Sequence, residues 1–341
     1  MTLQTASNVT PSPLMHLRSN LIMHQGLHAV AKLGIPDLLE RGPSTAAELA
    51  GELKVHEESL YRTLRALASQ GVFEESAPGT FQNTQLSRCL LTGAPGSLRP
   101  FFIFWGTEFY YRPLGEILYS IESGQPSRAK IFGGNEWEYM RQHPELAGIF
   151  DDAMTNFSDL MGPSIADAYD FGAWESIMDI GGGNGILLSH LLRRHTSLRG
   201  VLADQPHVLE RARERGFLGG ELATRTSLQE CDFFREVPSG CRAYVMKSVI
   251  HDWNDEKAKE ILTNCRQAVP ANGALFLVEW GLSEANQPAT GKLMDLVMLV
   301  LTGGKERTVA EYNTLLSSAG FRLNKVIPTA SEMVVIEAIP V

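Results

Sequence analysis

The second half of the chain alternates short apolar runs with segments whose apolar residues recur at helical spacing. The apolar runs are typical of buried strands and lie near residues 176–180, 199–204, 243–249 and 274–280. The helical segments lie near 186–195, 207–216, 254–268 and 309–319, and a closing hairpin is predicted over 321–327 and 333–339. Such alternation predicts an α/β fold with a doubly wound parallel sheet. Right-handed crossovers then bring the strand ends to one edge, where ligands bind in such folds.

The first hundred residues have a different pattern, which is that of a small helical domain. Helical spacing covers 14–39, with an interruption at Gly34-Ile-Pro36, and also 59–68. Between these segments, Ser44 or Thr45 followed by Glu48 has the pattern of a capping box at the start of a short helix. Two short strands separated by a turn come next and predict a hairpin. Helices followed by a hairpin predict a winged helix-turn-helix.

A winged helix often binds DNA, and a surface that reads DNA should be basic. Between residues 30 and 90 the chain has six Lys or Arg and eight Asp or Glu, and the whole chain has a net charge of −9. We therefore predict a packing and dimerisation domain with no nucleic-acid partner. A regulator that senses a small molecule and binds DNA through this domain is the alternative.

The segment 99–160 between these two parts is aromatic and mostly helical. Most of its aromatic side chains are expected to be in the core. Trp105, Phe109 and Phe157 could instead line a pocket for a flat aromatic substrate. We divide the chain into a winged-helix domain, a helical linker and substrate-pocket region, and a C-terminal α/β domain, with the bounds 1–98, 99–170 and 171–341.

Composition limits the class of protein. The chain has 341 residues, of which 44% are hydrophobic and 20% are charged, as in ordinary globular proteins. Its apolar runs are shorter than the roughly 18 residues of a membrane span. Residues 1–13 lack the pattern of a signal peptide, so we expect a cytoplasmic protein without a membrane partner. The four cysteines form no C-x-x-C pair, so neither a metal site nor a disulfide framework is predicted.

A glycine turn follows the first predicted strand of the sheet. Gly181, Gly183 and Gly185 form a G-x-G-x-G pattern, and Asp204 ends the next strand. Glycines let a ligand approach the backbone closely, and a carboxylate at that strand end accepts both hydroxyls of a ribose. With Asp179 ahead of it, the compact turn resembles the S-adenosylmethionine loop of class I methyltransferases. A Rossmann-type turn for another nucleotide is the alternative.

Side chains at the ends of two further strands form a candidate catalytic site. His251 comes just after the third strand and Glu279 near the end of the fourth, so both should lie at the ligand edge. Glu306 follows a glycine turn within 303–308 and is a further candidate for the same site. A histidine oriented by carboxylates is the arrangement of a general base.

The proton of a phenol is the one that such a base would accept. A free phenol has a pKa of about 10 and an imidazole about 6.5, so complete transfer is uphill by roughly 5 kcal/mol. A carboxylate that stabilises the imidazolium narrows this gap, and methyl attack while the proton leaves narrows it further. Alternatively, His251 caps the helix that begins near Asn254.

Together these motifs resemble the two-domain, cation-independent O-methyltransferases, a family that includes plant caffeate and flavonoid enzymes and bacterial polyketide and phenazine enzymes. The resemblance rests on Asp179-Ile-Gly-Gly-Gly-Asn-Gly185, Ala203-Asp-Gln-Pro-His207, Cys231-Asp-Phe-Phe234, His251-Asp-Trp253 and Gly303-Gly-Lys-Glu-Arg-Thr308. It implies a Rossmann-like methyltransferase sheet, S-adenosyl-L-methionine as the methyl donor, and a homodimer formed through the N-terminal domain.

The resemblance also implies roles for individual residues. His251 is the expected general base, flanked by Glu279 and Glu306. The residues expected to bind the donor are Gly181, Asp204, Asp232, Phe233, Lys247 and Ser158. The residues expected to line the acceptor site are Met154, Phe157, Trp105, Met298, Thr302 and Met15, the last of them reaching the site of the partner subunit.

The resemblance predicts an enzyme that transfers a methyl group to a hydroxyl of a planar aromatic small molecule in secondary metabolism. Family members that perform N-methylation or donor-assisted hydroxylation or decarboxylation are the alternative, and some of these lack the base. Pocket residues vary widely within the family, so the resemblance does not identify the acceptor.

Overall fold

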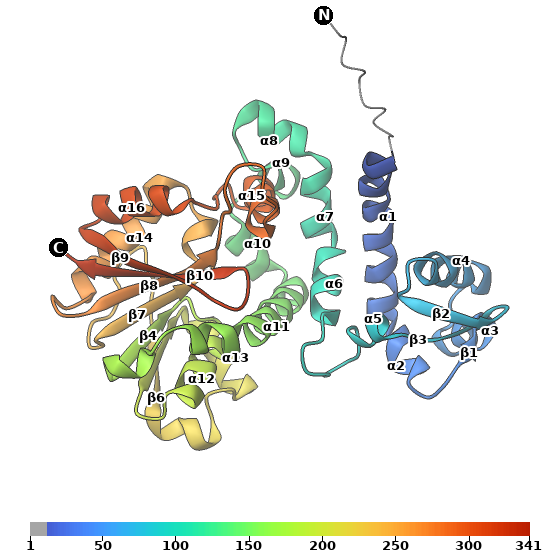
Figure 1. The fold of residues 1–341 in the computed structure, drawn as a ribbon, viewed down its shortest axis with the longest axis horizontal. Helices are drawn as coiled ribbons and strands as arrows, with labels where there is room; N and C mark the ends of the chain where they lie inside the picture. Colours follow the sequence, from blue (N-terminus) through green and yellow to red (C-terminus); the bar gives the residue numbers. More distant parts are fainter. Residues whose placement is uncertain (1–11) are drawn as a thin grey trace, which may run out of the picture. The chain divides into compact units, whose positions relative to one another are not determined.

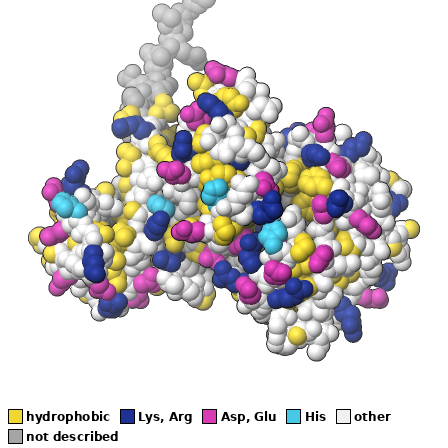
Figure 2. Space-filling view, turned by 180° about the vertical axis from the view of Figure 1, so that it is seen from behind, with side chains coloured by type: hydrophobic (Ala, Val, Ile, Leu, Met, Phe, Trp, Pro, Cys, Tyr) yellow, Lys and Arg dark blue, Asp and Glu magenta, His cyan; other side chains and the backbone are white. Residues whose placement is uncertain are grey.

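The computed structural model describes residues 12–341, which form two compact units that meet between Glu108 and Phe109 (Figure 1). Within these residues, no helix combines the length and the apolar character needed to cross a membrane. Basic and acidic side chains are interspersed over the face of the molecule shown in Figure 2.

The N-terminal unit has the predicted combination of helices and a hairpin. Its elements are α1 (Ser12–Leu33), α2 (Ile35–Leu39), β1 (Ser44–Thr45), α3 (Ala46–Leu53), α4 (Glu57–Ala68), β2 (Phe73–Ala77), β3 (Thr80–Asn83), α5 (Gln85–Arg88) and α6 (Arg99–Trp105). The strands pair antiparallel in the order β1-β3-β2. The apolar faces of α3 and α4 pack on this sheet around Leu64 and Phe81, which are fully buried.

Two local predictions for this unit are confirmed. Gly34 adopts a positive φ of 69° and separates α1 from α2, where the sequence indicated an interruption. Thr45 is the cap of α3, because its hydroxyl accepts a hydrogen bond from the Glu48 backbone N–H at 3.2 Å. In return, the Glu48 carboxylate accepts from the Thr45 backbone N–H at 2.7 Å, which completes the capping box.

The C-terminal unit is built on a seven-stranded sheet in the order β6-β5-β4-β7-β8-β10-β9. Its strands are β4 (Ser176–Ile180), β5 (Arg199–Asp204), β6 (Thr226–Glu230), β7 (Ala243–Lys247), β8 (Ala274–Trp280), β9 (Phe321–Pro328) and β10 (Met333–Pro340). The first five strands in this order are parallel, and β10 pairs antiparallel with both β8 and β9. The order reverses between β4 and β7, so a crevice for a ligand is expected where these strands end.

Helices cover both faces of the sheet, as Figure 1 shows. One core contains buried residues of α14 (Asp255–Ala268) and α16 (Val309–Ser318), and the other contains those of α11 (Pro144–Ala168), α12 (Ile186–Arg194) and α13 (Pro206–Arg215). The other helices are α7 (Glu108–Gly115), α8 (Ile117–Ser123), α9 (Ser127–Phe132), α10 (Glu136–Gln142), α15 (Thr290–Leu301) and the 3-10 turns η1 (Phe171–Trp174), η2 (Gly220–Arg225) and η3 (Ile250–Asp252).

The predicted strands and helices of this unit are confirmed, with two additions. Strand β6 was not predicted because it is a sheet edge with exposed polar residues and has no apolar run. Helix α15 was not predicted because its apolar residues are nearly continuous and therefore show no helical period. Strand β7 ends at Lys247, two residues before the predicted end, because Ser248 turns the chain with a φ of 52°.

Candidate active site

The glycine turn between β4 and α12 is held by the end of β5. Gly181 has a φ of 66°, and a Cβ there would lie 3.1 Å from a methyl group of Val249, so a side chain at this position would be both strained and crowded. The Gly183 N–H donates to Asp204 Oδ2 at 2.9 Å, and the Gln205 N–H donates to Oδ1 at 2.7 Å. Burial raises the pKa of Asp204 to about 6. This carboxylate therefore braces the turn, and it also has lone pairs left for ribose hydroxyls.

Among the other expected donor-binding residues, Phe233 adjoins this turn. The Phe233 ring lies next to Gly181, since a Cβ on that glycine would be 3.6 Å from the ring, and Asn264 holds the Phe233 carbonyl with a hydrogen bond of 2.9 Å. Asp232 is exposed, and its carboxylate accepts from the Phe234 N–H at 3.1 Å. Ser158 is half-buried on α11.

Lys247 is a cation at the end of β7, a central strand of the sheet. Its ammonium lies 4.9 Å from the centroid of the Phe157 ring, close enough for a cation–π contact. Burial lowers the pKa of Lys247 to about 8, against the attraction of Asp179, Glu279 and Asp252. Its neighbours in the structure are thus a ring and carboxylates, and its expected contact with the adenine stays a prediction.

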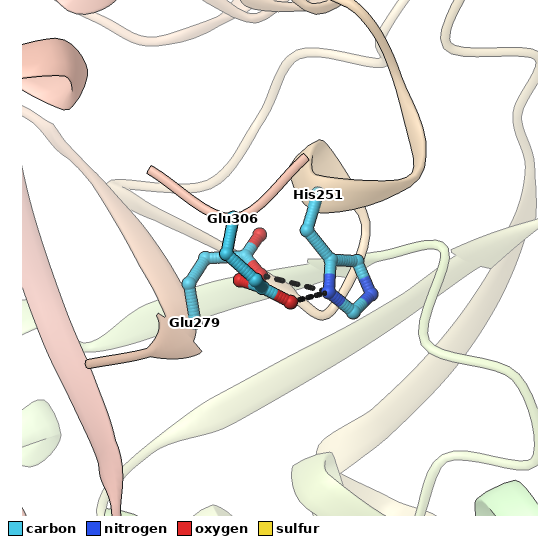
Figure 3. Close-up of side chains that lie close together, drawn as sticks. All are labelled: His251, Glu279 and Glu306. Atoms are coloured by element: carbon cyan, nitrogen blue, oxygen red, sulfur yellow. Dashed lines mark hydrogen bonds and ion pairs between the residues drawn. The ribbon is translucent and has the colours of Figure 1, made fainter. Parts of the chain in front are cut away.

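His251 and the two predicted glutamates meet at one point (Figure 3). His251 lies in η3 directly after β7, Glu279 on β8, and Glu306 in the loop before α16. His251 Nδ1 is 2.6 Å from Glu306 Oε1 and 3.9 Å from Glu279 Oε2. Both carboxylates therefore approach the same ring nitrogen, and Nε2 points away from them.

The side chains of this cluster are buried, at 6% exposure or less. Burial, reinforced by neighbouring acidic groups, raises the pKa of Glu279 to about 7 and that of Glu306 to about 8. Glu279 Oε1 accepts from the Ile250 N–H at 3.1 Å, and the Glu306 N–H donates to Asp295 at 2.8 Å. Each glutamate is thus positioned by a second hydrogen bond. When Glu306 is ionised, it favours the tautomer with hydrogen on Nδ1, which leaves the lone pair of Nε2 free to accept a proton.

The alternative role of His251 as a helix cap is wrong. Asn254 caps α14, because its side-chain oxygen accepts from the Lys257 N–H at 3.0 Å. His251, Glu279 and Glu306 also place one potential ligand atom each within 4.8 Å of one another, a spacing that a metal ion could use. The short hydrogen bond from Nδ1 to Glu306 accounts for this grouping without a metal.

Arg307 connects the loop of His251 to that of Glu306 and was not identified from the sequence. Its side chain is completely buried and donates to the carbonyls of Ile250 at 3.2 Å and Trp253 at 2.7 Å. It also donates to Asp255 at 2.9 Å. Gly304 lies so close that a Cβ there would be 2.0 Å from the His251 carbonyl oxygen. The signal in the sequence was a pair of basic residues, Lys305 and Arg307, on either side of Glu306, and the sequence does not indicate which of them is buried.

Four of the expected acceptor-site residues belong to the C-terminal unit. Met154 and Phe157 are half-buried on α11, and Phe157 stacks on Trp280 with 5.4 Å between the ring centroids. Met298 is buried on α15, and the Thr302 hydroxyl accepts from the Gly304 N–H at 2.9 Å. The structure thus connects Thr302 to the loop of Glu306, which the sequence did not indicate.

The remaining aromatic and apolar candidates have different surroundings. Phe109 is buried and stacks on Tyr139 with a centroid distance of 5.4 Å, which is a core position. Trp105 belongs to the N-terminal unit and packs on Phe101 at 4.9 Å. Met15 is 53% exposed on α1 of the same unit. For Trp105 and Met15, contact with the acceptor stays a prediction.

Comparisons with known proteins agree with this geometry. The model of the O-methyltransferase domain matches residues 114–322, and that of the O-methyltransferase dimerisation domain matches residues 15–93. The chain is 40% identical to phenazine O-methyltransferase PhzM of Lysobacter antibioticus, over 97% of this chain and 96% of the relative. The crystal structure of LaPhzM has a TM-score of 0.93 at 40% identity and covers 97% of this chain and 99% of that one.

A further solved structure identifies the methyl donor. NcsB1 from neocarzinostatin biosynthesis, in complex with S-adenosyl-L-homocysteine and 1,4-dihydroxy-2-naphthoic acid, is 31% identical with a TM-score of 0.81, over 98% of this chain and 100% of that chain. S-adenosyl-L-homocysteine is what the donor becomes after losing its methyl group. The open backbone at Gly183, where a Cβ would meet nothing within 4 Å, and the free lone pairs of Asp204 fit such a nucleoside. The chain therefore belongs to the O-methyltransferase family with the class I fold, and it is an S-adenosyl-L-methionine-dependent O-methyltransferase.

Proposed function

We propose that this enzyme methylates a hydroxyl of a planar aromatic metabolite, with His251 as the general base. The observation that carries the proposal is the 2.6 Å contact between His251 Nδ1 and Glu306, which orients the ring and leaves Nε2 for the acceptor. S-adenosyl-L-methionine, when bound, supplies the methyl group from a positively charged sulfonium. Gly181, Asp204, Asp232, Phe233, Lys247 and Ser158 are the residues that would hold it.

In this mechanism the residues of the chain handle one proton. Nε2 of His251 accepts the hydroxyl proton as the acceptor oxygen gains the methyl group, and the imidazolium so formed is stabilised through Nδ1–H by Glu306 and Glu279. The donor loses its positive charge in the same step, so a site without water favours the reaction. The proton leaves His251 after the product does.

The walls of the acceptor site are Met154, Phe157, Met298 and Thr302. Methionine and aromatic side chains suit flat rings, because they provide polarisable contact area. A homodimer formed through the N-terminal unit covers the apolar side chains that α1 exposes, among them Leu17 at 65% and Met15 at 53%. In that dimer Met15 reaches the acceptor site of the partner subunit.

A screen of wild-type protein tests this function. S-adenosyl-L-homocysteine release is measured with phenols, hydroxyanthraquinones and hydroxyphenazines, and the hydroxyphenazines come first because a relative of this chain carries phenazine in its name. Product analysis by NMR assigns the new methyl group to oxygen, nitrogen or carbon. A methyl ether supports the proposal, whereas an N-methyl product or a hydroxylated product without a methyl group would contradict it.

Activity should rise with pH up to about 8. Burial raises the pKa of Glu306 to about 8, so below this value the carboxyl keeps its proton and donates it to Nδ1. A neutral imidazole then carries its own hydrogen on Nε2, which cannot act as a base. The logarithm of kcat/KM should therefore increase by up to about one per pH unit from pH 6 and level off near pH 8. Glu306→Gln should lower and flatten this profile, and a flat profile in the wild type would refute the role of Glu306.

Removal of divalent cations should leave the activity unchanged. His251, Glu279 and Glu306 are close enough to ligate a metal ion, but the proposed chemistry uses them as a base and its orienting carboxylates. Dialysis against EDTA is expected to change kcat by less than about twofold, because general-base catalysis needs no Lewis acid. Loss of activity that Mg²⁺ or Zn²⁺ restores would show that the cluster holds a metal.

A further inference from the structure

Glu136, the first residue of α10, is a buried acid that the mechanism above does not use. Its exposure is 7%, and among the described residues none donates a hydrogen bond to its carboxylate. The nearest cationic atom is Arg128 Nε, 3.9 Å from Oε2, which is beyond hydrogen-bond distance. Buried carboxylates are ordinarily satisfied by hydrogen bonds, so this one has unused acceptor capacity.

Arg128 does not satisfy Glu136, because its own N–H groups bind the backbone. Nε donates to the Leu301 carbonyl at 2.9 Å, and the two terminal nitrogens donate to the carbonyls of Gly134 at 2.7 Å and Gly133 at 3.4 Å. The guanidinium therefore braces the ends of α9 and α15. Its positive charge partly compensates the negative charge of Glu136, but it does not occupy the lone pairs of that carboxylate.

The segment that contains Arg128 and Glu136 adjoins the catalytic loops. A Cβ on Gly303 would lie 3.3 Å from the Pro126 ring at the start of α9, and Gly304 packs on the backbone of His251 and Asp252. Thr302, an expected acceptor-site residue, directly follows the Leu301 carbonyl that Arg128 binds. Short contacts thus connect α9 and α10 to the loop that positions His251.

Asp252 is a further acidic residue of this region, and it lies next to the reactive nitrogen of His251. Its carboxylate lies 3.7 Å from His251 Nε2, whereas Glu279 and Glu306 approach Nδ1. Burial raises the pKa of Asp252 to about 7, the charge of His251 opposes this rise, and Glu136 adds to it, so the two carboxyl groups repel one another. An acidic acceptor, Asp252, therefore borders the side of His251 on which an aromatic hydroxyl would approach.

We propose that the Glu136 carboxylate accepts a hydrogen bond from a second hydroxyl or amino group of the aromatic acceptor, and thereby selects dihydroxy or amino-hydroxy arenes. The inference rests on the function proposed above and adds the substrate class. A site built to hydrogen-bond a substrate group discriminates strongly against analogues that lack it, because its own polar atom is then left unpaired. Rings with a single hydroxyl are accordingly poor acceptors.

Equilibrium binding to protein saturated with S-adenosyl-L-homocysteine tests the selection separately from turnover. The probes are 1-hydroxyphenazine and 1-hydroxynaphthalene with a second hydroxyl on the neighbouring or the distal ring carbon, each paired with the counterpart that has fluorine at that position. Fluorine is close to hydroxyl in size but donates no hydrogen bond. The wild type should bind at least one dihydroxy probe about 10-fold or more tightly than its fluoro partner, as expected for a hydrogen bond to a charged group.

Glu136→Met keeps the volume of the side chain and should abolish this preference, and Glu136→Gln should reduce it. The matched control is Glu138→Met on the same helix, since Glu138 is exposed and pairs with Arg141, and it should leave the preference unchanged. Thermal unfolding shows whether each variant is folded, and the Gln variant provides the result if the Met variant is not.

The outcomes separate this inference from the proposed function. Equal binding of every pair by the wild type, or a preference that survives in both Glu136 variants, would overturn the inference and leave Glu136 as half of a structural ion pair. Methyl transfer to the same probes is measured in parallel. A preference that depends on Glu136 without any methyl ether product would support the inference and reject the proposed function.

Discussion

His251→Ala lowers kcat at least about 100-fold, with the affinity for S-adenosyl-L-homocysteine within about twofold of wild type. The large loss is expected because general-base catalysis typically contributes 10²–10⁴-fold, and no other group in the cluster can replace it. Glu279 and Glu306 approach the far nitrogen of the ring, so their oxygens lie on the wrong side to accept the proton. Steady-state kinetics with the acceptor found in the screen, together with calorimetric titration of S-adenosyl-L-homocysteine, measures both quantities.

His190→Ala is a suitable control for this experiment. His190 lies on α12 and pairs with Asp159 on α11 at 2.9 Å, and it has no contact with the catalytic cluster. Its replacement should change kcat by only a few-fold. Equal kcat values for wild type and His251→Ala would reject the role of His251 as the general base. They would favour a reaction that needs no base, such as N-methylation or donor-assisted hydroxylation.

Arg307→Met lowers both the stability and the turnover of the enzyme. The variant leaves the Trp253 carbonyl without its hydrogen bond and weakens that of Ile250, at a cost of about 2–4 kcal/mol in the free energy of unfolding. The carbonyls of Ile250 and Trp253 lie on either side of His251 in the chain. Without these hydrogen bonds the imidazole loses its fixed orientation, and kcat should fall about 10- to 100-fold. Urea unfolding and kinetics at saturating donor measure the two effects.

Lys305→Met is the matched control for Arg307. Lys305 pairs with the same Asp255 but is 38% exposed, so its removal should cost less than about 1 kcal/mol. A positioning role for Arg307 further predicts that kcat falls while the KM for the donor stays within about threefold, and that Arg307→Lys recovers part of kcat. A uniform loss of folded protein with unchanged kcat per folded molecule would show that Arg307 is only structural.

The sequence predicted the fold well where the pattern is strong. The strands at 176–180, 199–204 and 274–280 have the bounds that the structure shows, because each is an apolar run interrupted by a turn. Strand β6 was not predicted because an edge strand needs no apolar face, and α15 was not predicted because its apolar residues, exposed Leu293 and Leu296 included, are nearly continuous. In both cases the surroundings of the element in the fold, and not its own pattern of apolar residues, determine its secondary structure.

The catalytic cluster was predictable because topology alone brings strand ends together, and this placed His251 and Glu279 at one edge. The distances were not predictable. That Glu306 is the close partner at 2.6 Å and Glu279 the distant one at 3.9 Å depends on the path of a loop, which is held by Arg307 and by the absence of a side chain at Gly304. The burial of Glu136 was equally hidden, because a glutamate at the start of a short helix ordinarily lies in solvent.

The loop of His251 is held by hydrogen bonds with two side chains, and this has a consequence for how the enzyme could acquire new acceptors. Glu279 holds the Ile250 N–H from one side, and Arg307 holds the carbonyls of Ile250 and Trp253 from the other. The loop of the reactive ring is thus anchored to the sheet, whereas Glu306, the close partner of the ring, is also held from α15 through Asp295. Mutations in the walls that recognise the acceptor can change which molecule is modified while the proton-accepting machinery stays intact, provided that they spare Asp295, so new acceptors are within reach of small libraries confined to α9, α10 and the other positions of α15.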